Sequence, residues 1–126
     1  MDLEIIKIAS DTKNFKDIEN YTNYSSFKNP LCGDEIHIKL IIKNQKVVDF
    51  GYQGNSCVYC QATSSLLSKK LINWTTSKVD ELCDYVKNYF DQEDDILDKK
   101  WKFLEKLLCK KNLSKKECIL LPFNAL

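Results

Sequence analysis

Three cysteines and one aspartate stand where the hydrophobic pattern of the sequence breaks, and such positions usually present functional side chains. Cys32 precedes the first predicted strand, Cys57 precedes a predicted helix and Cys118 precedes the apolar end of the chain. Asp34 follows Cys32 across Gly33, a residue that lets the backbone turn tightly. Three thiolates and one carboxylate suit a tetrahedral site for zinc or iron. We therefore predict one metal site, which only the folded domain assembles because its ligands are far apart in the sequence.

Thiolates in such a site could also act as nucleophiles. A bound metal or a helix N-terminus lowers the pKa of a cysteine enough to populate the thiolate at neutral pH. A thiolate of this kind can accept sulfur from a donor persulfide. Each element is a weak indication when taken singly, because C-G-D occurs by chance and a buried cysteine is more often a small core residue than a ligand.

The other cysteines and the single histidine have simpler interpretations. Cys60 lies one helical turn after Cys57, so the two could bridge, share a metal or resolve a persulfide. A buried bystander thiol is the favoured interpretation of Cys60. Cys83 and Cys109 fall inside predicted amphipathic helices and are expected to pack in the core. His37 is predicted to be a surface imidazole on the polar side of a strand.

Length, composition and charge limit the kinds of protein that this chain can be. We treat 1–126 as one domain, because two cores in so short a chain would each be marginal. The segment 10–28 is polar and without a clear period, and its simplest interpretation is a loosely attached arm. The 19 basic and 18 acidic residues nearly cancel, which argues against nucleic acid or an anionic membrane as a partner. The first residues are acidic, whereas a secretory signal begins with positive charge. No apolar run approaches the ~20 residues that span a bilayer.

These features predict a cytoplasmic protein. In a reducing compartment, six cysteines favour metal binding or thiol chemistry over a disulfide framework.

The hydrophobic pattern predicts an α+β fold with a small antiparallel sheet on one side and helices on the other. Apolar and polar residues alternate through 36–52 and are interrupted at Asn44-Gln45, which predicts a β-hairpin. A final helix is expected to begin near Leu121, with Pro122 in its first turn. The acidic run 91–95 is expected to be a solvated loop. Apolar residues at helical spacing predict helices at 3–8, 58–72, 76–90 and 95–111.

The ordered motifs resemble the SufU/IscU scaffold proteins, which are similar to the amino-terminal domain of NifU. The resemblance covers roughly 29–126, and the N-terminal arm 1–28 matches only loosely. It is carried by N-P-L-C-G-D-E-I at 29–36, G-N-S-C at 54–57, Q-A-T-S-S at 61–65 and K-E-C-I-L-L-P-F-N-A-L at 116–126.

This resemblance implies a sheet of about three strands packed against several helices, and a protein of iron-sulfur cluster assembly. It implies zinc bound by Cys32, Asp34, Cys57 and Cys118, with iron or an iron-sulfur cluster as a transient alternative. Cys32 is our first choice as acceptor of persulfide sulfur. The implied partners are a SufS-like cysteine desulfurase and downstream iron-sulfur assembly or acceptor proteins.

Two features favour the SufU branch over the IscU branch. The stretch between Cys57 and Cys118 is long, and Glu117 stands where IscU-type proteins place a histidine. The L-P-P-V-K chaperone-docking motif of that branch is replaced by K-N-L-S-K at 111–115. Cys60 departs from the family pattern, which usually has a small residue there, and so questions whether only three thiols matter.

Two functions remain in competition at this point. In the first, the chain relays sulfur from the desulfurase, and whether it is itself a zinc-dependent sulfurtransferase stays open. In the second, it is a passive scaffold on which an iron-sulfur cluster is assembled and then transferred. A third interpretation is that the metal only stabilises the fold, in which case losing a ligand should unfold the domain.

Overall fold

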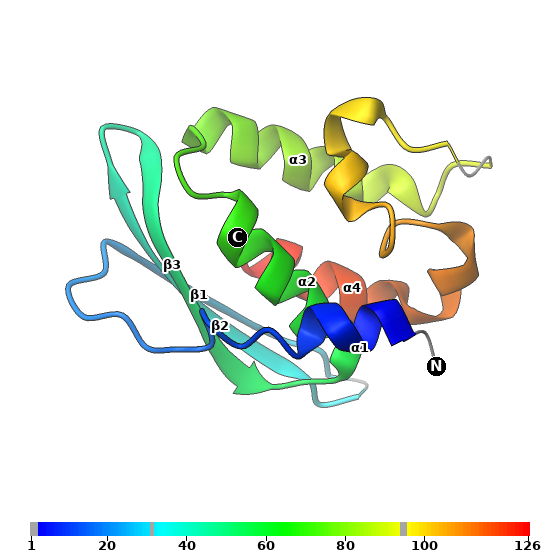
Figure 1. Cartoon of the computed structure of the whole chain (residues 1–126), viewed down its shortest axis with the longest axis horizontal. Helices are drawn as coiled ribbons and strands as arrows, with labels where there is room; N and C mark the ends of the chain where they lie inside the picture. Colours follow the sequence, from blue (N-terminus) through cyan, green and yellow to red (C-terminus); the bar gives the residue numbers. More distant parts are fainter. Residues whose placement is uncertain (1–2, 31, 94–95) are drawn as a thin grey trace.

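The fold is a three-stranded antiparallel sheet with helices on one side (Figure 1). The computed structural model describes residues 3–30, 32–93 and 96–126. The strands are β1 (Asn23–Lys28), β2 (Glu35–Lys43) and β3 (Lys46–Asn55), and β2 lies in the middle of the sheet. The α+β class and the strand number predicted from the sequence are confirmed.

The hairpin of β2 and β3 forms where the alternating pattern predicted it. Asn44 and Gln45 both have positive φ, at 52° and 62°, which is the conformation of a two-residue type I′ turn that matches the twist of the strands. Ile36 and Ile38 of β2 point into the core and are about 1% exposed. The paired register runs from Glu35 opposite Asn55 at the far end of the hairpin.

Four α-helices are present among the described residues: α1 (Leu3–Ala9), α2 (Val58–Lys70), α3 (Thr76–Tyr89) and α4 (Lys116–Ala125). Helices α2 and α4 contact the sheet and each other, α1 packs on α2, and α3 packs on α4. The three helices predicted at 3–8, 58–72 and 76–90 are confirmed. Thr75 caps α3 by accepting a hydrogen bond from the backbone N–H of Lys78 at 3.2 Å.

The expectation that 10–28 is a loosely attached arm is wrong for β1. Strand β1 pairs with β2 along its full length, from Asn23 opposite Leu40 to Lys28 opposite Glu35. All six residues of β1 are exposed, so the strand has no buried face. Its pairing rests on backbone hydrogen bonds, which leave no alternating pattern in the sequence.

The single helix predicted at 95–111 is also wrong. Two short 3₁₀ helices stand there instead, η1 (Lys99–Leu104) and η2 (Lys110–Lys115), and Trp101 has non-helical angles of φ −112° and ψ 24°. Leu107 and Leu108 lie between the two short helices and are both buried. An amphipathic helix can also bury adjacent residues, so the spacing of apolar residues did not distinguish one long helix from these short turns.

Helix α4 begins at Lys116, five residues earlier than the predicted start near Leu121. Pro122 therefore lies inside the helix rather than in its first turn. Proline has no backbone N–H, so the carbonyl of Cys118 lacks the helical hydrogen bond that residue 122 would otherwise donate. The sequence rule that places proline at a helix start failed because the preceding cysteine-containing turn is itself helical.

Parts of three predictions lie outside the described residues: Met1 and Asp2 of the acidic N-terminus, Leu31 of the first motif, and Asp94 and Asp95 of the acidic run. Across the described ranges, no helix has both the length and the apolar character required to cross a membrane.

Gly54 should be intolerant of any side chain. It has φ +146°, and an added Cβ would collide with the carbonyl oxygen of Glu35 on the paired strand. We expect Gly54→Ala to lower the free energy of unfolding by about 3 kcal/mol or more, from backbone strain and steric overlap together. Urea unfolding followed by circular dichroism measures this loss.

Gly33 supplies the matched control, because it has φ +78° but its added Cβ would meet no atom within 4 Å. Gly33→Ala should cost only the left-handed strain of about 1–2 kcal/mol. Equal losses for the two variants would contradict the role given to Glu35.

Candidate metal centre

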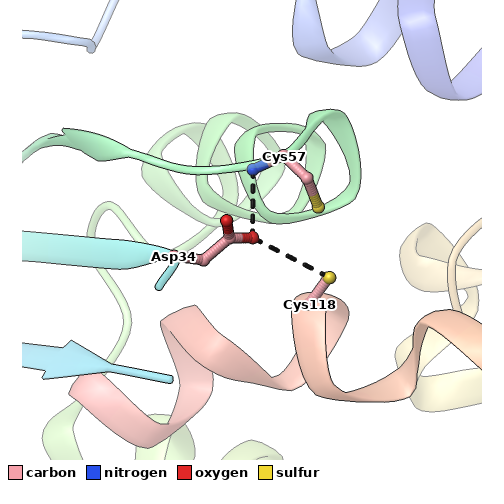
Figure 2. Close-up of side chains that lie close together, drawn as sticks. All are labelled: Asp34, Cys57 and Cys118. Carbon is pink, nitrogen blue, oxygen red and sulfur yellow. Dashed lines mark hydrogen bonds between the residues drawn. The ribbon is translucent and has the colours of Figure 1, made fainter. Parts of the chain in front are cut away.

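Asp34, Cys57 and Cys118 converge at one end of the sheet. One side-chain ligand atom from each lies within 4.8 Å of the others, and all three residues are half-buried. Asp34 comes just before β2, Cys57 is the N-cap of α2 and Cys118 lies in the first turn of α4. Figure 2 shows the two sulfurs and the carboxylate directed toward a common space. Three separate elements of the fold therefore build this group.

The Asp34 carboxylate connects the other two residues. Its Oδ2 accepts a hydrogen bond from the backbone N–H of Cys57 at 3.1 Å. The same oxygen accepts a weak hydrogen bond from the Cys118 thiol, with 3.9 Å between sulfur and oxygen (Figure 2). A carboxylate at the start of α2 is stabilised by the positive end of the helix dipole. The local geometry thus holds an anion beside both sulfurs.

The pKa of Cys118 is raised to about 12, first by burial and then by the neighbouring Cys57 thiol. Negative charge on Asp34 and Cys32 raises it further. Cys118 is therefore a protonated thiol at neutral pH when no cation is present. A metal ion would reverse this balance, because its charge stabilises the thiolate and its binding releases the proton.

Cys32 lies outside the group within 4.8 Å, although it is near enough for its charge to affect Cys118. Its side chain is exposed. The turn that carries it is closed by two backbone hydrogen bonds, from Asn29 N–H to the Asp34 carbonyl and from Gly33 N–H to the Asn29 carbonyl, each 2.8 Å long. The tight turn expected at Gly33 is confirmed by its φ of +78°. The part of Cys32 in the metal site stays a prediction.

Cys60 and Cys83 are both buried, as expected of packing residues. Burial raises the pKa of Cys60 to about 12 and that of Cys83 to about 11. Cys109 is half-buried, and the side-chain amide of Asn112 lies 3.4 Å from its sulfur. His37 stacks on Tyr24 at the surface of the sheet.

The imidazole of His37 has polar neighbours on both ring nitrogens. Nδ1 lies 2.6 Å from the Tyr24 hydroxyl, and Nε2 lies 3.5 Å from the Glu35 carboxylate. His37 is not part of the group formed by Asp34 and the two cysteines.

Sequence reasoning gave no role to the hydroxyls near Cys60. Ser56 and Ser64 both lower the pKa of Cys60, although burial outweighs them. Ser64 is fully buried. A serine in a helix gives no sequence pattern that separates a buried hydroxyl from an exposed one, so only the packing of α2 reveals it.

Comparison with known proteins decides the family. The sequence model described as "NifU-like N terminal domain" matches residues 3–89. The chain belongs to the NifU-like N-terminal domain family. The match begins at residue 3, so the resemblance reaches further toward the N-terminus than the range 29–126 expected from the motifs. Cys118 lies beyond the matched range, and its link to Asp34 and Cys57 rests on the structure.

One curated protein is similar to this chain over part of its length. The IscU iron-sulfur cluster assembly scaffold protein of Thermotoga maritima is 29% identical over 82 residues, which are 64% of this chain. The aligned part spans only 58% of that relative's length.

Two solved structures share the fold. A nitrogen-fixing NifU-like protein (N-terminal) from Brucella abortus has a TM-score of 0.85 at 17% identity, covering 98% of this chain and 87% of its own. A putative iron-sulfur cluster assembly scaffold protein for the SUF system from Fervidobacterium islandicum AW-1 has a TM-score of 0.87 at 22% identity, covering 99% and 92%.

The donor set of this NifU-like domain fits a thiophilic metal. Two thiols and one carboxylate lie close enough to share an ion, and such ligands suit zinc or iron. Oxygen binds these metals less firmly than thiolate does, so the carboxylate is the natural ligand to exchange. The exposed Cys32 thiol is the nearby candidate for a fourth position.

Removing one ligand should weaken metal binding sharply. We expect Asp34→Asn, Cys57→Ser and Cys118→Ser each to lower the affinity for Zn²⁺ by more than about 100-fold, since even outer partners of a ligand contribute 10–100-fold. Competition titration with a chromophoric chelator measures the affinity. Cys83→Ala is the control and should bind normally.

Cys32→Ser in the same titration tests the predicted fourth ligand. A loss as large as that of Cys118→Ser places Cys32 on the metal. Unchanged affinity would restrict the site to the three residues that the structure brings together.

The metal-free protein should lose stability in alkaline solution. Cys60 and Cys118 have folded-state pKa values of about 12, raised from the ordinary value of 9.0. Their contribution to folding stability is fully present below pH 9, because both thiols are then protonated in the folded and in the unfolded protein. It is lost as the pH rises from 9 through 12. Thermal melts between pH 8 and 11 measure this decline. Cys60→Ala should make the decline shallower without removing it, because Cys83 and Cys118 also have raised pKa values, and an unchanged slope in that variant would contradict the burial effect.

Proposed function

We propose that this chain is an iron-sulfur cluster assembly protein that binds zinc and accepts persulfide sulfur from a cysteine desulfurase. The observation that carries the proposal is the convergence of Asp34, Cys57 and Cys118 beside the turn that holds Cys32. Membership of the NifU-like N-terminal domain family and the scaffold named in Thermotoga maritima support the same process.

The proposed division of labour follows from exposure. Cys32 is exposed, so a donor on another protein can reach its sulfur without opening the domain. Cys57 and Cys118 are half-buried and are better suited to hold a cation. Zinc bound there would stabilise nearby thiolates at neutral pH. Asp34, as the oxygen ligand, would yield its position most readily when another group approaches the metal.

Sulfur transfer to Cys32 is a thiol exchange. The Cys32 thiolate attacks the terminal sulfur of the donor persulfide, and a new S–S bond forms while the donor S–S bond breaks. The donor cysteine leaves as a thiolate. No net oxidation takes place, because the sulfane sulfur only changes its carrier. The attacking sulfur, the transferred sulfur and the departing donor sulfur must lie in line during this step. An exposed acceptor on a tight turn leaves room for that alignment.

The finer assignments belong to the same proposal. We place the chain in the SufU branch, on the long stretch between Cys57 and Cys118 and on Glu117. Its partners would be a SufS-like desulfurase and downstream iron-sulfur assembly or acceptor proteins, in the cytoplasm. Iron or an iron-sulfur cluster would be cargo of the site.

A passive scaffold is the second candidate. It is favoured by the name of the Thermotoga maritima relative, which is a cluster assembly scaffold protein. Anaerobic reconstitution with iron and sulfide distinguishes the two, because a scaffold yields a stable chromophore that can be transferred to an acceptor. Chelation followed by thermal melting tests a purely structural metal, whose removal should unfold the domain.

The sulfur relay predicts stimulation of a desulfurase. Adding the wild-type protein to a SufS-like desulfurase should raise its turnover of cysteine several-fold, because an efficient acceptor clears the enzyme persulfide. Cys32→Ala and Asp34→Ala should remove the stimulation, whereas Cys83→Ala should keep it. Sulfide or alanine production measures turnover. Absence of stimulation by the wild type would reject the relay.

A further inference from the structure

Cys57 and Cys60 occupy paired positions at the start of α2. Cys57 is the N-cap, with extended angles of φ −73° and ψ 170°, and its side chain makes no capping hydrogen bond. Its carbonyl accepts the first helical hydrogen bond, from Gln61 N–H at 3.0 Å. Cys60 is then the third helical residue. The N-cap and the third helical residue lie one turn apart on the same side of the helix, and C-x-x-C at a helix start is a redox-active spacing.

The surroundings of Cys60 contain an unused polar group. Ser64 lies one turn further along α2 and is fully buried, and its hydroxyl has no hydrogen-bond partner among the residues that the structure describes. Ser64 and Ser56 both stabilise negative charge on the Cys60 sulfur. Cys57 and Asp34 are near enough for their charges to act on the same sulfur. Cys60 is therefore a buried neighbour of Asp34 and Cys57 in the candidate metal centre.

We propose that Cys60 is a resolving thiol, which reduces sulfane sulfur carried by Cys57 and releases it as sulfide. This inference rests on the proposed function for the supply of sulfur. It extends that function, because cluster building consumes sulfide, whereas a desulfurase delivers sulfur at a higher oxidation level.

The chemistry balances within the chain. The Cys57 thiolate first takes the terminal sulfur from the Cys32 persulfide, and Cys32 is restored as a thiolate. The Cys60 sulfur then attacks Sγ of Cys57, so that a Cys57–Cys60 disulfide forms and the bond to the terminal sulfur breaks. The terminal sulfur leaves as HS⁻ with the proton from Cys60. The two thiols supply two electrons, and an external dithiol reductant restores them for another turnover.

The burial of Cys60 suits this step. A resolving thiol beneath the surface is shielded from solutes, and a persulfide on Cys57 would lie one helical turn away from it. Holding both groups on one element replaces a collision by an internal reaction. The unpartnered Ser64 hydroxyl can donate a hydrogen bond to the Cys60 sulfur as it develops negative charge during attack.

The test uses the full-length reduced, metal-free protein, loaded with sulfur in two ways and then freed of reagent. One sample is loaded by a SufS-like desulfurase and cysteine, the other by inorganic polysulfide, which needs no enzyme. Tryptic cleavage after Lys46 and Lys69 yields one peptide, 47–69, whose only cysteines are Cys57 and Cys60. Alkylation and mass spectrometry of that peptide distinguish thiols, persulfide and disulfide, and a sulfide assay follows the released product.

We expect the loaded wild type to release one sulfide for each internal disulfide, with both cysteines of the peptide resistant to alkylation. Cys60→Ala and Cys60→Ser should retain the persulfide and release sulfide at least tenfold more slowly. Cys83→Ala, which removes another buried thiol, should behave as the wild type. The measurement on the wild-type peptide does not depend on how well the variants fold.

Two results separate the proposals. Polysulfide-loaded wild type whose Cys57 and Cys60 remain alkylatable, with sulfide release unchanged in Cys60→Ala, would overturn the resolving role. Failure of the desulfurase to load or to be stimulated, with internal disulfide and sulfide still formed after polysulfide loading, would overturn the proposed sulfur relay and uphold the dithiol chemistry.

Discussion

The contact between the Asp34 carboxylate and the start of α2 organises the functional end of this domain. One oxygen accepts the backbone N–H of Cys57 and also meets the thiol of Cys118. The sheet, α2 and α4 are thereby joined at a single charged atom. Placing a carboxylate beside protonated thiols is unfavourable for ionising those thiols, and the N-terminus of α2 offsets part of that cost. A bound cation would relieve the remainder, because it neutralises the crowded negative charge.

Most of the fold could be predicted where burial leaves a regular pattern. The hairpin followed from alternating residues, with Asn44 and Gln45 marking its turn, and α2 and α3 followed from apolar spacing. Strand β1 could not be found in this way, because it buries no face. The segment around Trp101 failed for the opposite reason: several apolar residues are buried without a regular backbone.

The candidate site was predictable in type and only partly in geometry. Residues at pattern breaks pointed to Asp34, Cys57 and Cys118, and the fold brings these together. The exposed position of Cys32 and the buried hydroxyl of Ser64 could not be predicted, because both depend on how loops and helices pack. Membership of the family indicates the cellular process, whereas the role of each thiol depends on its exposure and on the residues around it. The burial of Cys60 was expected from the usual packing of free cysteines, whereas the outward position of Cys32 emerges only in three dimensions.

Pro122 gives the Cys118 turn a mechanical property of its own. Pro122 has no backbone N–H to donate to the carbonyl of Cys118. The first turn of α4 is therefore held to the rest of the helix by fewer hydrogen bonds than an ordinary first turn. Ile119, Leu121 and Phe123 are buried and fix the body of α4 against its neighbours. The buried Ile119 still anchors the first turn, so the missing hydrogen bond loosens chiefly the end of the helix that carries Cys118. An ion bound there, as proposed, would meet a sulfur whose position can adjust to its radius.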